Sequence, residues 1–117
     1  MHKTKVGTFN AIIYVELRAK YKSHSHTIRY SLAFDFIQEY CDRVGLCVTV
    51  TETTFIYTKG REPGIIVGLI NYPRFPKDPE DIKNIALDLA NKLKHYCNQN
   101  RVSIVFPDET IMLGAKE

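Results

Sequence analysis

The sequence predicts an α+β domain in which a mostly antiparallel sheet of about six strands carries two amphipathic helices on one face. Segments with the alternation or β-branched content of strands are joined mainly by connections too short for parallel crossovers. Two longer segments have apolar residues at helical spacing, and such helices cover one face of a sheet. The other face, with Tyr14, Glu16, Thr49 and Arg101, is left for solvent, a ligand or another subunit.

The chain has the length and composition of one globular domain. At 117 residues it is of single-domain size, so residues 1–117 are predicted to form one domain. Its 44% hydrophobic and 25% charged residues are typical of globular proteins. The apolar run 65–70 is too short to span a membrane, and the N-terminus lacks a signal-peptide pattern. We therefore expect a cytoplasmic protein, and its net charge of +3 is too small to predict DNA or RNA binding.

The first part of the chain predicts a strand and then a helix. From Ala11 to Leu17 apolar residues fall at every second position, the pattern of a half-buried strand over residues 10–18. Residues 21–27 are polar and predict a loop. From about Thr27 apolar residues recur every three or four positions up to Val44. Gly45 follows, where a helix commonly ends in the left-handed conformation.

The remaining elements are predicted from strand-forming residues and turn residues. Residues 46–51 and 53–58 predict two strands or one long bent strand. Two glycines and a proline predict a turn over 59–64, before an apolar strand over 64–71 that is central in the sheet. Asp78 as N-cap and Pro79 as first residue predict the start of the second helix. Residues 101–106 and 110–113 predict two further strands.

No catalytic constellation is recognisable in the sequence. Cys41, Cys47 and Cys97 have no paired spacing, so we interpret them as reduced thiols. His24 and His26 are at most two ligands, which do not define a metal site, and a polar surface loop is the simpler interpretation. Phosphate-binding glycine loops and nucleophile elbows are missing. We therefore expect a protein that is not an enzyme and that has no cofactor and no metal.

The region 61–75, together with Arg101, is the best candidate for ligand binding. Asn71, Tyr72, Arg74 and Phe75 lie in a loop that two prolines stiffen. An aromatic ring stacks on a base, a guanidinium pairs with phosphate, and an amide bonds polar edges, so this set suits a nucleotide. The alternative is structural: the two rings plug the core edge, and Arg74 pairs with an acidic residue of the following helix. Arg101 is open to the same two interpretations.

Several segments resemble one family of small phage proteins. They are residues 54–58 (Thr-Phe-Ile-Tyr-Thr), 62–64 (Glu-Pro-Gly), 68–76 (Gly-Leu-Ile-Asn-Tyr-Pro-Arg-Phe-Pro) and 101–110. The sequence is similar there to the first family of Thoeris anti-defence proteins, over roughly residues 10–113. The resemblance implies a sponge that sequesters cyclic ADP-ribose isomers, and in some members cyclic trinucleotides, without cleaving them. It also implies a homodimer or hexamer in the host bacterial cytoplasm, with pocket residues at Arg61, Tyr72, Arg74, Phe75 and Arg101.

Two hypotheses of different kinds follow. The first is the phage anti-defence sponge, which inhibits Thoeris immunity by holding the signal nucleotide. The alternative is a non-catalytic oligomeric interaction or structural protein with no small-molecule ligand, whose exposed sheet face makes only subunit contacts. A small hydrolase that uses His24 or His26 ranks last, because nothing else in the sequence completes its site.

Overall fold

The computed structural model describes residues 1–20 and 25–114, and within them one antiparallel sheet of five strands dominates the fold. The strand order is β4-β5-β1-β6-β7, and every pairing is antiparallel. A separate hairpin is formed by β2 and β3. The elements are β1 (Asn10–Glu16), β2 (Arg18–Lys20), β3 (Ser25–Thr27), α1 (Tyr30–Val44), β4 (Thr49–Tyr57), β5 (Gly60–Ile70), α2 (Pro79–Tyr96), β6 (Arg101–Val105) and β7 (Thr110–Gly114).

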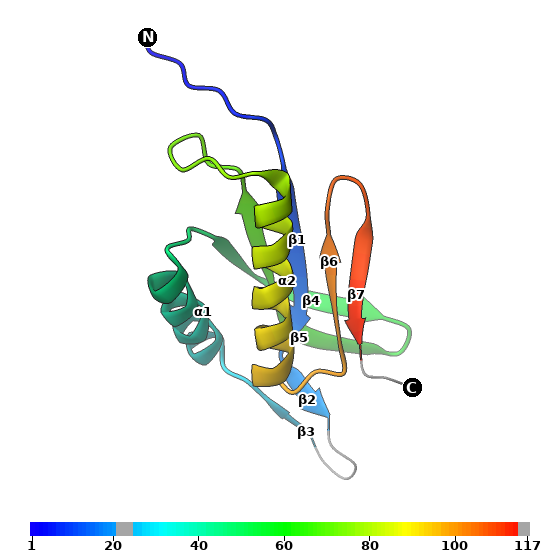
Figure 1. The fold of residues 1–117 in the computed structure, drawn as a ribbon. Helices are drawn as coiled ribbons and strands as arrows, with labels where there is room; N and C mark the ends of the chain where they lie inside the picture. The colour runs from blue at the N-terminus through cyan, green and yellow to red at the C-terminus, as the bar shows by residue number, and fades with distance from the viewer. Residues whose placement is uncertain (21–24, 115–117) are drawn as a thin grey trace.

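The hydrophobic core lies between the sheet and the two helices, which both cover the same face (Figure 1). In β1 the buried residues alternate with half-buried ones, because successive strand side chains point to opposite faces. Ile13 and Val15 are fully buried, as are their partners Val67 and Ile65 in β5. Leu89 of α2 is fully buried in the same cluster. This confirms the predicted α+β class.

Both helices follow their predicted positions. Helix α1 ends at Gly45, whose φ of 76° is left-handed and whose N–H donates to the Cys41 carbonyl. Helix α2 begins at Pro79, and Asp78 occupies the N-cap position. In the described part of the chain the Asp78 side chain makes no capping hydrogen bond, so its predicted role is wrong. No described helix is long and apolar enough to cross a membrane.

The strands differ from the prediction in number and in bounds. Instead of about six strands, the described residues form five in the main sheet and two in the hairpin. Residues 46–51 and 53–58 merge into the single strand β4, which begins only at Thr49. The predicted turn over 59–64 shrinks to its first residues, because β5 already begins at Gly60. The apolar strand β5, which we predicted to be central, is second in the sheet, and β1 holds the central position.

Pro63 explains why the turn prediction failed. Proline lacks an N–H, and we expected it to interrupt regular structure. In the structure Pro63 pairs with Thr54 of β4, and its carbonyl accepts a hydrogen bond of 3.0 Å from the Leu17 N–H. The strand tolerates proline there because β1 has already ended at Glu16, beside Gly64.

Candidate functional site

The loop after β5 is held in shape mainly by Asn71. The Asn71 side chain donates to the Gly7 carbonyl at 2.8 Å, and its oxygen accepts from the Lys77 backbone N–H at 2.9 Å. Its backbone N–H donates to the Phe9 carbonyl at 3.0 Å. A further turn bond joins the Phe75 N–H to the Tyr72 carbonyl at 2.9 Å. Both groups of the Asn71 side-chain amide are thus used in hydrogen bonds that hold this loop, while the stiffening predicted from the prolines stays a prediction.

Beside this loop lies an apolar cavity of about 310 Å³. Tyr72 and Phe75 line it together with Cys47 and Lys77, and residues of α2, of β5 and of the segment after α1 complete it. A hydrogen bond with Cys47 and partial burial raise the pKa of Tyr72. Arg74 lies on the outer side of the loop, where its guanidinium carbon is 5.4 Å from the centre of the Phe75 ring. Of the four loop residues predicted from the sequence, Tyr72 and Phe75 are among the residues that line the cavity, whereas Asn71 and Arg74 are not.

Arg61 and Arg101 lie elsewhere. Arg61 pairs with Ile56 near the hairpin end of β5 and is exposed. It is eight residues from Leu69 of the cavity, about 26 Å along a strand that rises about 3.3 Å per residue. Arg101 begins β6 and lines a separate polar hollow with Glu16. The six predicted residues thus occupy three places, and their contact with a ligand stays a prediction.

A second group of aromatic and acidic side chains lies on the sheet face that the helices leave open. The register places Tyr14 opposite Ile66, Glu16 opposite Gly64, and Phe55 opposite Glu62, so their side chains share this face. Glu62 is 1% exposed and is the buried charged residue of the described chain. The Tyr57 hydroxyl donates a hydrogen bond of 2.9 Å to the Oε1 atom of Glu62.

Glycines let aromatic rings lie directly on the strands at this face. A Cβ atom on Gly64 would lie 2.1 Å from Cε2 of Phe55, and one on Gly60 would lie 2.4 Å from Cε2 of Tyr57. The Phe55 ring in turn contacts Tyr14 edge to face, with 6.5 Å between the ring centres. Tyr57 itself remains 46% exposed. The result is a surface of three rings, one of which has its hydroxyl hydrogen-bonded to a buried carboxyl group.

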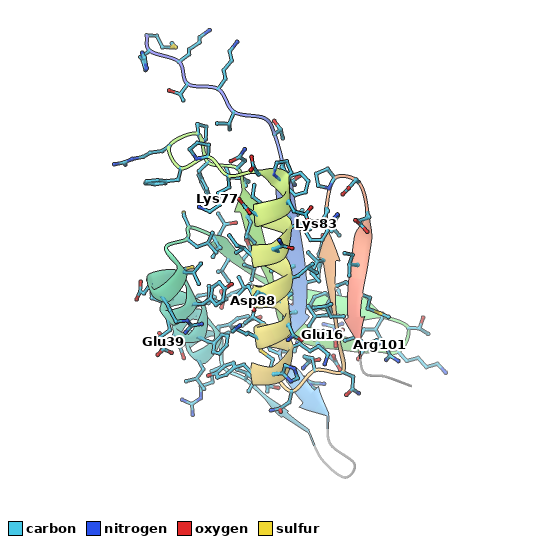
Figure 2. All side chains as sticks on the ribbon, in the orientation of Figure 1. Glu16, Glu39, Lys77, Lys83, Asp88 and Arg101 are labelled. Carbon is cyan, nitrogen blue, oxygen red and sulfur yellow. The ribbon has the colours of Figure 1, made fainter. Side chains whose placement is uncertain are left out.

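A polar hollow of about 220 Å³ adjoins this surface at the end of β1 and the start of β6. It is lined by Glu16, Asn98, Gln99, Asn100 and Arg101. Figure 2 shows Glu16 and Arg101 at the same end of the sheet. Glu16, Tyr57, Glu62 and Arg101 all have interaction partners within the chain. Aromatic rings, a buried acid and a charged hollow together could receive a ligand that is aromatic at one end and charged at the other.

In the described part of the chain, neither Cys97 nor Cys41 offers a reactive thiol. Cys97 is buried, and burial raises its pKa to about 11, which disfavours a reactive thiolate. Burial likewise raises the pKa of Cys41. His24 lies outside the described residues, and His26 falls in β3, so the structure does not address the predicted pair. Among the residues that the structure describes, no three His, Cys, Asp or Glu side chains are grouped as for a metal.

The Tyr57–Glu62 pair was missed because the sequence predicted a turn over 59–64, which includes Glu62, after the strand that holds Tyr57. The available signal was the pairing of an aromatic residue and an acid across a two-residue connection. Thr58 and Lys59 connect β4 to β5, and the φ of 62° at Lys59 is the left-handed conformation that tight hairpins use. That connection brings Tyr57 and Glu62 to the same face five residues apart.

Two solved structures that are similar to this chain are of phage SAM lyases. An α+β fold covering the whole chain recurs in a phage SAM lyase in its apo state, with a TM-score of 0.80 and 17% identity over 100% of this chain and 97% of that one. It recurs in a phage SAM lyase in complex with S-methyl-5'-thioadenosine, with a TM-score of 0.74 and 15% identity over 98% and 95% of the two chains. No protein-family model and no curated protein matches the sequence.

These structures contradict the expected function. The sequence predicted a non-enzymatic anti-defence sponge for cyclic ADP-ribose isomers and cyclic trinucleotides, or an interaction protein without a ligand. The proteins that share the fold are lyases, and the ligand seen in one is a thioadenosine. The reasoning failed because it took the lack of a contiguous motif for the lack of a site, whereas the open-face residues come from separate strands. Neither structure tests the resemblance to the Thoeris anti-defence family or the oligomeric state. Both the resemblance and the expected homodimer or hexamer therefore stay predictions.

Proposed function

We propose that this protein is a lyase that cleaves S-adenosylmethionine and releases S-methyl-5'-thioadenosine, with the open sheet face as its active site. The observation that carries the proposal is the Tyr57–Glu62 hydrogen bond within a surface of aromatic rings. The fold, shared over the full chain with a phage SAM lyase, supports it. We expect the protein to act in the cytoplasm, where S-adenosylmethionine is made.

The substrate is a sulfonium cation attached to an adenosine, and the open face suits both parts. Cations bind over the faces of aromatic rings, best where water is excluded. The Glu62 carboxyl group accepts a hydrogen bond from the Tyr57 hydroxyl, which makes the ring richer in electrons and its face more attractive to a cation. Tyr14 and Phe55 offer apolar surface on which the adenine can stack.

The reaction breaks the bond between the sulfonium sulfur and Cγ of the methionine part. Both electrons of that bond go to sulfur, which becomes the neutral thioether of the product. A lyase adds no water across the bond, so Cγ either bonds to the substrate's own carboxylate oxygen, which closes a lactone, or forms a double bond to Cβ while solvent water takes up the Cβ proton. Because positive charge on sulfur disappears in this step, the attraction of the rings for a cation acts on substrate binding and is lost in the neutral thioether product.

Product analysis tests the proposal directly. The purified protein is incubated with S-adenosylmethionine, and the adenosine-containing products are identified by chromatography and mass spectrometry. We expect S-methyl-5'-thioadenosine to form, and Glu62→Gln and Tyr57→Phe each to lower kcat/KM by about tenfold or more, equivalent to about 1.4 kcal/mol. Glu39→Gln, at an exposed position of α1, is the matched control and should keep the wild-type rate.

Two results would count against the proposal in different ways. If the wild-type protein releases no S-methyl-5'-thioadenosine, the lyase activity is wrong. If the product forms but both open-face variants retain the full rate, the activity stands and the site lies elsewhere. Circular dichroism of each variant establishes that the fold is intact before rates are compared.

A further inference from the structure

The polar hollow beside the aromatic surface differs from it in chemistry. It is built on the turn after α2, where the N–H groups of Asn98 and Gln99 donate to carbonyls of the helix at 3.2 and 2.9 Å. The Gln99 amide donates to the carbonyls of Arg18 and Cys97. These bonds fix the turn against the sheet. The hollow therefore has a defined shape, with an acid and a base on its sheet side.

The register sets how close the hollow lies to the Tyr57–Glu62 pair. Glu16 pairs with Gly64, which is two residues from Glu62 on the same strand and face. Diagonal neighbours of this kind are about 7–8 Å apart. Tyr14 pairs with Ser103 at the end of the β1–β6 pairing, and just beyond it Glu16 and Arg101 line the same hollow. A small molecule can therefore contact the rings and the hollow at the same time.

The amino-acid end of S-adenosylmethionine carries one positive and one negative group. An arginine binds a carboxylate with two parallel hydrogen bonds, and a carboxylate accepts from an ammonium group. Arg101 and Glu16 present this pair of charges at one hollow, and Asn98 and Asn100 add amide groups. Each of the two charged residues already has a partner in the chain, and ligand groups would share or replace those contacts. The thioadenosine part of the substrate has no such pair of charges.

We propose that the hollow binds the α-amino and α-carboxylate groups of S-adenosylmethionine, with Arg101 on the carboxylate and Glu16 on the ammonium. This inference rests on the proposed function and deepens it. The hollow selects the intact substrate over its nucleoside product, because cleavage detaches the group that it holds. Loss of these contacts after cleavage then favours release of S-methyl-5'-thioadenosine.

Calorimetric titration with two ligands that are not cleaved tests the inference. S-adenosylhomocysteine keeps the amino-acid end and has a neutral sulfur, whereas S-methyl-5'-thioadenosine lacks that end. We expect Arg101→Gln to weaken binding of S-adenosylhomocysteine by about tenfold or more and to change the Kd of S-methyl-5'-thioadenosine by less than about twofold. Glu16→Gln should show the same asymmetry, and Arg43→Gln on α1 should change neither Kd.

The outcomes separate this inference from the proposed function. If both variants weaken the two ligands equally, or weaken neither, the hollow does not hold the amino-acid end and the inference is wrong, while the lyase proposal stands. If the wild-type protein binds neither ligand, the proposed function fails and the inference fails with it.

Discussion

At the residue scale, Gly64 decides how the aromatic rings lie on the open face. The Phe55 ring occupies the space that a side chain at position 64 would need, and the carbonyl oxygen of Val15 would lie 2.6 Å from an added Cβ atom. A ring can move, but the backbone of the central strand cannot move without disturbing its pairing with β5. Glycine is therefore required there by close approach, and not by a left-handed backbone.

Gly64→Ala should consequently both destabilise the protein and displace Phe55. Overpacking of this kind costs about 1–3 kcal/mol. We expect that decrease in the free energy of urea unfolding, together with weaker binding of S-methyl-5'-thioadenosine. Gly7→Ala is the matched control, since a Cβ atom there meets nothing within 4 Å. Equal unfolding free energies for Gly64→Ala and the wild type would show that the Phe55 ring does not rest on this glycine.

At the scale of elements, the loop after β5 depends on one side chain. Asn71 joins the N-terminal segment to the loop through Gly7 and closes the loop through the Lys77 N–H. Asn71→Ala should lower the free energy of unfolding by about 1 kcal/mol, because two partners lose their hydrogen bonds. The Lys77 amide should exchange its hydrogen faster, whereas Asn91→Ala at an exposed helix position should not affect it. Unchanged protection of Lys77 would contradict this account.

The end of α2 makes stability sensitive to alkaline pH through Cys97. Burial raises the pKa of this thiol from 9.0 to about 11, so the folded state keeps a proton that the unfolded state loses. The stabilisation is fully present below about pH 9 and is lost as the pH rises toward 11. The free energy of unfolding falls by at most about 2–3 kcal/mol through this titration.

Urea unfolding at pH 7, 9, 10 and 11 measures this effect. The wild type should lose stability more steeply than Cys97→Ala, which is less stable at every pH because of lost packing but lacks the titrating group. Tyr40, whose pKa is also raised by burial and by its bond to Asp88, titrates in both proteins and cancels in the comparison. Parallel curves for the two proteins would show that Cys97 does not contribute.

Local sequence patterns predicted the elements wherever local energetics determine them. The apolar spacing of α1 with Gly45, and the start of α2 at Pro79, depend on neighbours in sequence and were confirmed. The beginning of β5 was missed because pairing with β4 and the hydrogen bond from Leu17 keep Pro63 in a strand. Those partners are distant in sequence, so the local propensity of the residues around Pro63 predicts a turn where the structure has a strand.

At the scale of the whole molecule, the candidate site is a product of topology. Its residues come from β1, β4, β5 and β6, and only strand order and register bring Tyr14, Tyr57, Glu62 and Arg101 to one face. The sequence predicted that this face would be free for a ligand and placed Arg101 on it. It missed the Tyr57–Glu62 pair because Glu62 was placed in a turn, and no contiguous motif encodes the strand order that brings Tyr14 and Arg101 to the same face.

The fold leaves two places where a nucleoside could bind, and they are well separated. One is the open face at Tyr57 and Glu62, and the other is the cavity lined by Tyr72 and Phe75. A crystal structure of the protein with S-methyl-5'-thioadenosine decides between them most directly. Our account predicts the adenine against the rings of Tyr14, Phe55 or Tyr57, with the sulfur near Tyr57. A nucleoside seated between Tyr72 and Phe75, with the open face empty, would contradict it.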